Sequence, residues 1–187
     1  MVDVNWAYKL GESLLAEPLP RRWAHTRGVA ARSESLAPLL AEDAEILVAA
    51  AVLHDIGYSP AVVETGFHPL DGARHLRTLP AVDQRIVRLV ANHSFALLEA
   101  EERGLRQALE EEFPALDDHL LVDALVFCDM TTTPDGAATT SYARVEEVLG
   151  RYGTDSVVGR FIRRAAPAIH GSVERVQARA AEVGLTL

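Results

Sequence analysis

The sequence predicts an all-α fold. Alternating β-branched and aromatic residues closed by tight turns, the pattern typical of strands, are almost absent from the 187 residues. Apolar residues instead recur at the three- and four-residue spacing of a helix face along most of the chain. Prolines, glycines and capping acids divide this pattern into segments of helix length. Together these observations predict one helical domain over residues 1–187.

Each expected helix has a boundary signal in the sequence. The signals are acids that can cap N-termini, prolines suited to first turns and glycines suited to C-termini, namely Asp3, Asp43, Pro20, Pro69, Gly57 and Gly153. Pro167 should kink or split the last helix. The expected helices are Asp3–Glu17, Pro20–Leu40, Asp43–Ile56, Pro69–Leu79, Ala81–His93, Leu105–Phe113, Asp117–Met130, Tyr142–Tyr152 and Ser156–Val183.

The composition excludes several classes of protein. The chain is 49% hydrophobic and 24% charged, which is ordinary for a globular domain. Its longest apolar run, Ile46–Leu53, is far shorter than the roughly 20 residues of a membrane helix. Cys128 is the only cysteine, so an internal disulfide is excluded, and the net charge of −9 disfavours nucleic acid. We therefore expect a cytoplasmic protein that binds neither nucleic acid nor membrane.

Four separate helices carry a polar residue on an otherwise apolar face. These residues are His25, His54, His93 and Asp129. One such histidine is usually a hydrogen-bonded core residue, but four indicate a shared site, because buried polar groups need partners. Histidine and aspartate are metal ligands, and a cation would compensate the inward carboxylates. Asp55 follows His54 at a helix end, where both can face one cavity and the carboxylate can bridge two cations.

Three motifs contain most of these residues: "RRWAHTRGVA" with His25, "VLHDIG" with His54 and Asp55, and "LVFCDMTT" with Asp129. Together they resemble the signature of the HD-domain superfamily of metal-dependent phosphohydrolases. The resemblance covers roughly residues 20–135. It implies an HD domain in which C-terminal helices, about residues 141–184, pack on the family-like core.

Two further histidines extend the resemblance to the dinuclear members of the superfamily. His68 lies in "TGFHPLDGARHL" and His93 in "LVANHSFA". The resemblance implies one metal on His25, His54, Asp55 and Asp129, and a second on His68, His93 and the shared Asp55, with the His54–Asp55 doublet at the catalytic centre. A nitrogen-rich ligand set favours two divalent transition-metal ions, iron first, with manganese, cobalt, zinc or nickel as alternatives.

The resemblance implies hydrolysis of a small-molecule phosphate ester or anhydride, such as that of a nucleotide, by a metal-activated water. Candidate substrate contacts are residues near the motifs that can bind phosphate oxygens, namely Arg27, Arg74, Arg77, His75 and Thr131. Ser94 lies beside His93 without a nucleophile-elbow motif, so we expect no hydrolytic triad. Two alternatives stay open: a mixed-valent di-iron oxygenase, which needs the same ligands, and a non-catalytic nucleotide-sensing module.

Overall fold

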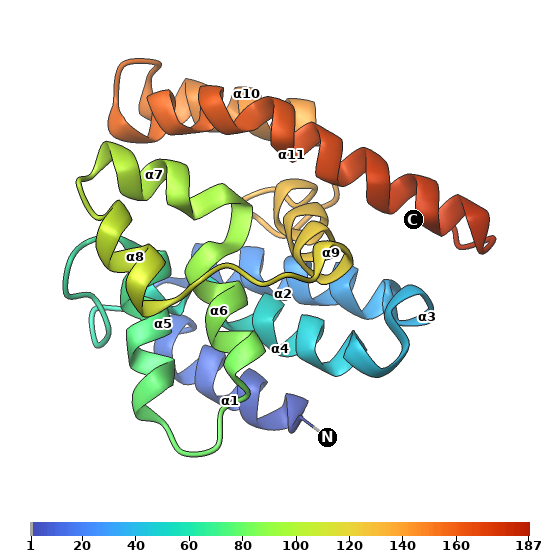
Figure 1. The fold of residues 1–187 in the computed structure, drawn as a ribbon, viewed down its shortest axis with the longest axis horizontal. Helices are drawn as coiled ribbons and strands as arrows, with labels where there is room; N and C mark the ends of the chain where they lie inside the picture. The colour runs from blue at the N-terminus through green and yellow to red at the C-terminus, as the bar shows by residue number, and fades with distance from the viewer. Residues whose placement is uncertain (1) are drawn as a thin grey trace.

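The fold is helical throughout residues 2–187, which are the residues that the computed structural model describes (Figure 1). Within that range the only paired extended backbone is an isolated bridge between Thr132 and Ala138. The helices are α1 (Val4–Leu15), α2 (Pro20–Ser35), α3 (Ala37–Leu40), α4 (Ala44–Leu53), α5 (His68–Thr78), α6 (Gln84–Asn92), α7 (Ala96–Glu102), α8 (Arg106–Glu112), α9 (His119–Met130), α10 (Ser141–Tyr152) and α11 (Val157–Glu182). Short 3-10 helices η1 (Ala41–Asp43), η2 (Ile56–Tyr58) and η3 (His93–Phe95) join some of them. The all-α prediction is confirmed.

Helix α4 forms the centre of the main core. Every residue from Ile46 to Leu53 is buried, and the helix packs against α1, α2, α6 and α9. A helix that is apolar on all sides must be surrounded in this way, because it has no face for water. The His54–Asp55 doublet follows the last residue of α4, so both side chains enter the protein interior.

The last two helices form a layer over one side of the molecule (Figure 1). Helix α11 packs against α9, α10 and α7, and a second apolar cluster that includes Met130, Val145 and Phe161 fills the space between these elements. Of the kink or split predicted at Pro167, the split does not occur, because α11 runs unbroken from Val157 to Glu182. Pro167 and Arg163 are both exposed, so water can bind the carbonyl that the proline leaves without a donor. No helix within residues 2–187 is long and apolar enough to cross a membrane.

Other features of the helices also differ from the expectation. The helix predicted over residues 20–40 ends at Ser35, and α3 begins anew with Pro38 in its first turn. A proline ring at that position would clash with the carbonyl of Glu34 in a continuous helix. Asp43 caps no helix through its side chain, because its carboxylate pairs with Arg85 at 2.6 Å. Helix α7 (Ala96–Glu102) was not expected at all.

Gly57 brings the chain segment after the doublet against α5. It lies inside η2 rather than at a left-handed helix terminus, so the predicted C-cap role is wrong. A Cβ atom at this position would lie 2.0 Å from the backbone oxygen of His68. The absence of a side chain therefore lets η2 and the start of α5 pack backbone to backbone, which places His68 close to Asp55. Gly153, with a φ of 78°, does end α10 as predicted.

Candidate metal centre

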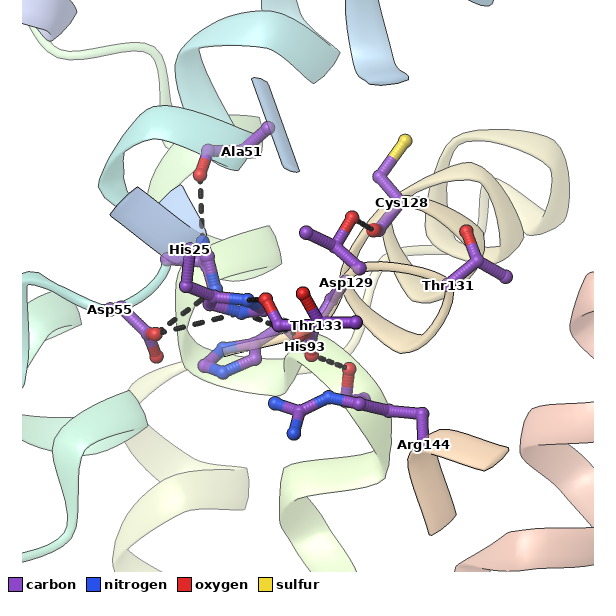
Figure 2. Close-up of polar contacts among 12 residues, drawn as sticks. His25, Ala51, Asp55, His93, Cys128, Asp129, Thr131, Thr133 and Arg144 are labelled. Carbon is purple, nitrogen blue, oxygen red and sulfur yellow. Dashed lines mark hydrogen bonds and ion pairs between the residues drawn. The ribbon is translucent and has the colours of Figure 1, made fainter. Parts of the chain in front are cut away.

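Five helices bring six residues together in one cluster, which is buried apart from a partly exposed His68. The cluster takes His25 from α2, His54 and Asp55 from the end of α4, His68 from the start of α5, His93 from the end of α6, and Asp129 from α9. His54 is only 1% exposed and Asp129 only 7%. Figure 2 shows the side chains of His25, Asp55, His93 and Asp129 turned into a common space. The structure thus brings together all six residues that the sequence singled out as candidate ligands.

His25, His54 and Asp55 form one group of candidate ligands. The Nε2 atoms of His54 and His25 lie 3.3 and 4.0 Å from the Asp55 Oδ2 atom. Asp129 lies directly beside this group, because its Oδ1 atom is 3.1 Å from the Nε2 atom of His25. Four side chains therefore direct ligand-type atoms towards one point.

The second group shares Asp55 with the first and adds His68 and His93. The His68 Nε2 atom lies 3.4 Å from the Asp55 Oδ1 atom and 3.1 Å from the Nε2 atom of His93. The two oxygens of Asp55 thus face different histidine groups. This is the arrangement by which one carboxylate can bridge two cations.

Backbone carbonyls orient three of the histidine rings. The Nδ1 atoms of His25, His54 and His93 lie 3.0, 2.7 and 2.7 Å from the carbonyl oxygens of Thr133, Ala51 and Val90. A carbonyl oxygen only accepts, so Nδ1 carries the hydrogen and donates in each case. In the neutral ring the lone pair is then on Nε2, which faces the cluster. Such outer partners are typical of metal-binding histidines.

The Nε2 atom of His54 is the clearest sign that the cluster is built for a cation. This atom is buried and forms no hydrogen bond within residues 2–187, although the Asp55 Oδ2 atom lies 3.3 Å from it. Buried polar atoms without partners are rare in folded proteins, so each one calls for an explanation. Four imidazoles and two carboxylates fit divalent transition-metal ions, which would take up the free Nε2 lone pair and balance the carboxylates.

The charges of the cluster agree with this fit. Burial raises the pKa of Asp55, but Arg22 and His54 outweigh that effect and hold the pKa well below its usual range. Burial lowers the pKa of His54, while Asp55 and Asp129 raise it to about 9. For His68 and His93, burial is the largest effect and lowers the pKa of both. The carboxylates are therefore anionic and the second histidine pair is neutral, as ligands must be. His54, with a pKa of about 9, is protonated at neutral pH and would release its Nε2 proton when a cation binds.

Arg22 and Tyr58 contact the cluster residues from outside, and the sequence did not identify them. The Arg22 Nη1 atom donates to the Asp55 Oδ2 atom at 2.8 Å. Its guanidinium lies 4.0 Å from the centre of the Tyr58 ring, and that ring stacks on His68 at 4.0 Å. Arg22 precedes His25 by three residues, so helical spacing could have identified it.

Ser94 also has a role that differs from a nucleophile. Its hydroxyl donates to Asp129 in a short hydrogen bond, which fixes one oxygen of that carboxylate. Ser94 and the next residue, Phe95, both adopt left-handed backbone conformations, with φ of 49° and 62°. Such conformations are strained for residues other than glycine and cluster at functional sites.

Arg74 and Arg77, two of the predicted substrate contacts, do not reach the cluster. Both donate to Glu112 of α8, and Arg74 does so in a bidentate pair at 2.5 and 3.2 Å. Arg77 also lies over the ring of Phe113. These arginines join α5 to α8 instead of facing the ligands.

The other three predicted contacts are also absent from the cavity over the cluster. Arg27 is exposed on α2, and His75 lies half-buried on α5. The Thr131 hydroxyl donates to the carbonyl of Phe127 and accepts from Arg32 at 2.7 Å. The Thr131 hydroxyl is therefore already hydrogen-bonded within the protein, and its bond with Arg32 joins α9 to α2.

A cavity of ≈ 90 Å³ lies over the cluster. Asp55, His68, His93 and Asp129 contribute to one side of it, while Arg22 and Arg144 supply positive charge. The opposite wall is largely apolar and comes from α10 and α11, through Val148, Val158, Phe161 and Ile162. The C-terminal helices therefore cover the candidate metal centre and shape the space above it.

Comparison with known families identifies the fold. The family model described as HD domain matches residues 22–124, more than half of the chain. HD domains generally belong to a superfamily of metal-dependent phosphohydrolases and bind divalent metals. No curated protein and no solved structure matches the chain. The match includes five of the six cluster residues. Because it extends over more than half of the chain, the chain belongs to the HD-domain family.

Proposed function

We propose that this HD domain hydrolyses a phosphate ester or anhydride of a small molecule, such as a nucleotide. The observation that carries the proposal is the six-residue cluster with Asp55 at its centre, beneath a cavity with arginines in its wall. A ligand set of this kind suits cations that bind phosphate, and the arginines suit its remaining oxygens. The formal net charge of −9 argues against a nucleic acid partner.

Two divalent transition-metal ions are the cofactors in this proposal, with iron first and manganese, cobalt, zinc or nickel as alternatives. His25, His54, Asp55 and Asp129 would hold one ion, and His68, His93 and Asp55 the other. When bound, such ions lower the pKa of water and neutralise the charge of a phosphoryl group. The four imidazoles support a transition metal rather than magnesium, because nitrogen ligands suit the softer ions.

Side chains and backbone carbonyls around the candidate ligands fix the orientation of those ligands. Ser94 fixes the orientation of Asp129, and the carbonyls of Ala51 and Val90 fix two of the rings. Arg22 lines the cavity beside Asp55 and can donate to oxygens of the substrate phosphate. The apolar wall from α10 and α11 limits bulk water, which strengthens charge interactions inside the cavity. Hydrolysis would then break the phosphorus–oxygen bond to the leaving group and add the oxygen of water to phosphorus.

The test is phosphate release under strict anaerobiosis. Metal-depleted protein is reloaded with iron(II), manganese or cobalt and assayed on a panel of phosphomonoesters, nucleotides and phosphate anhydrides. We expect release of phosphate from at least one substrate class, dependent on added metal and independent of oxygen. Metal-depleted protein is the control.

Three outcomes would contradict hydrolysis. Silence on the whole panel, with oxygen consumption on a hydroxylated substrate and a mixed-valent iron signal, would establish the oxygenase alternative. Tight nucleotide binding without turnover in any metal form would favour the sensing module. Turnover that survives complete metal removal would contradict the assigned cofactors.

A further inference from the structure

Arg144 lies in the wall of the metal cavity but outside the residues that match the HD family. It belongs to α10, and Figure 2 shows its guanidinium extending from that helix towards the cluster. The residue is only 6% exposed, and its Nε atom is buried without a hydrogen-bond partner within residues 2–187. A buried cationic donor that is left unpaired is costly, so its position indicates a ligand that completes it.

The positive charge around Arg144 is also only partly neutralised. Its Nη1 atom pairs with Glu147, and the same Glu147 oxygen accepts from Arg151 at 3.0 Å. One carboxylate therefore faces two guanidinium groups. Arg22, the third arginine of this wall, is paired with Asp55. The pair Arg144 and Arg151 thus has a surplus positive charge directed at the cavity.

These arginines line two spaces of different size, and the larger one also reaches His25 of the cluster. The cavity over the cluster is ≈ 90 Å³, and a neighbouring pocket of ≈ 310 Å³ shares Arg22, Arg144 and Arg151 with it. Small-molecule sites usually measure about 300–1,000 Å³, so the smaller cavity suits only a compact group such as a phosphate. The larger pocket is lined in part by Pro18, Leu19, Pro20 and Pro134, which suit a neutral or apolar moiety.

We propose that the substrate carries a second anionic group, a carboxylate or a second phosphate, which Arg144 and Arg151 bind. The scissile phosphate would occupy the cavity over the cluster, and the rest of the molecule would extend past the arginines into the larger pocket. This inference rests on the proposed function and narrows its substrate class to doubly anionic phosphate compounds. Arg144 and Arg151 are then specificity residues that α10 adds to the family core.

Binding of three matched phosphonates to manganese-loaded protein tests the proposal without turnover. Propylphosphonate has one anionic group, 3-phosphonopropionate replaces its methyl with a carboxylate, and 1,2-ethylenediphosphonate replaces it with a second phosphonate. Calorimetry should show that one or both doubly anionic probes bind at least about tenfold more tightly than propylphosphonate, as expected for charge-assisted hydrogen bonds. The tighter of the two identifies the second group as carboxylate or phosphate.

Variants assign that preference to the arginines. Arg144→Gln should remove the preference, because it should weaken binding of the doubly anionic probes at least about tenfold more than binding of propylphosphonate. Arg151→Gln should reduce the preference for the doubly anionic probes. Because Arg151 is more exposed, this variant tests the proposal even if Arg144→Gln does not fold. Arg164→Gln is the matched control, because Arg164 pairs with Glu101 and Glu102 and does not line the cavity.

The outcomes distinguish this inference from the proposed function. Equal affinity of wild-type protein for all three probes would overturn the second-anion proposal while leaving the phosphate site intact. A preference that persists unchanged in folded Arg144→Gln and Arg151→Gln would overturn the assignment to these arginines. Failure of every probe to bind would overturn the proposed phosphate site, and this inference with it.

Discussion

Asp55→Ala is expected to release both metal ions and to lower phosphate hydrolysis by at least about a thousandfold, equivalent to about 4 kcal/mol of activation free energy. Asp55 is the only residue common to the two candidate ligand groups, and its two oxygens face different histidines. Its loss also leaves Arg22 without its carboxylate beside the remaining ligands, where a positive charge opposes cation binding. Metal analysis of the purified variant, together with the phosphate assay, measures both effects.

The matched control for this variant is Asp123→Ala. Asp123 is also a buried aspartate paired with an arginine, since both its oxygens accept from Arg175 at 2.6 and 2.7 Å. It belongs to α9 as Asp129 does, but it contacts none of the six cluster residues through its hydrogen bonds. We expect it to keep wild-type metal content and activity. Wild-type metal content in Asp55→Ala would remove that residue from the proposed centre.

His93→Ala is expected to lower metal content from two ions to one and activity by at least roughly a hundredfold. His93 belongs to the second ligand group only, so its removal leaves that group with His68 and Asp55. The loss of activity should exceed the roughly 10–100-fold effect of removing a residue that only supports a ligand. Metal analysis and the phosphate assay again provide the measurement.

His119→Ala is the control for the His93 substitution, because the His119 side chain is 95% exposed and lies outside the cluster. It should leave both metal content and activity unchanged. Loss of both ions from His93→Ala would show that the two groups do not bind independently. Retention of two ions with full activity would contradict the role of His93 as a ligand.

Periodicity in the sequence explains why the structure brings the candidate ligands together. His25, His54, His93 and Asp129 continue apolar helix faces, so the fold that buries the faces also brings these residues together. The helix after His93 was missed because it starts from a left-handed turn at Ser94 and Phe95 that has no glycine to signal it. Local sequence carries little information about such strained turns.

The predicted phosphate contacts failed for a different reason. Arg74 and Arg77 lie near His68 in sequence, but Glu112, a carboxylate from a distant segment, holds both of them. Arg144 lies in the cavity wall because α10 folds back over the core, which no helical spacing predicts. Long-range pairing of charged side chains therefore limits prediction of the cavity lining, whereas helix periodicity accounts for the convergence of the candidate ligands.

The central proposal is that four histidines, Asp129 and the shared carboxylate of Asp55 hold two metal ions, and metal stoichiometry tests it most directly. Protein purified anaerobically from its native host should contain about two transition-metal ions per chain, with iron the most abundant. A crystal structure of that protein should place both ions against Asp55, with His68 and His93 on one of them. A protein fully occupied by a single ion, with His68 and His93 turned away from it, would contradict the dinuclear centre.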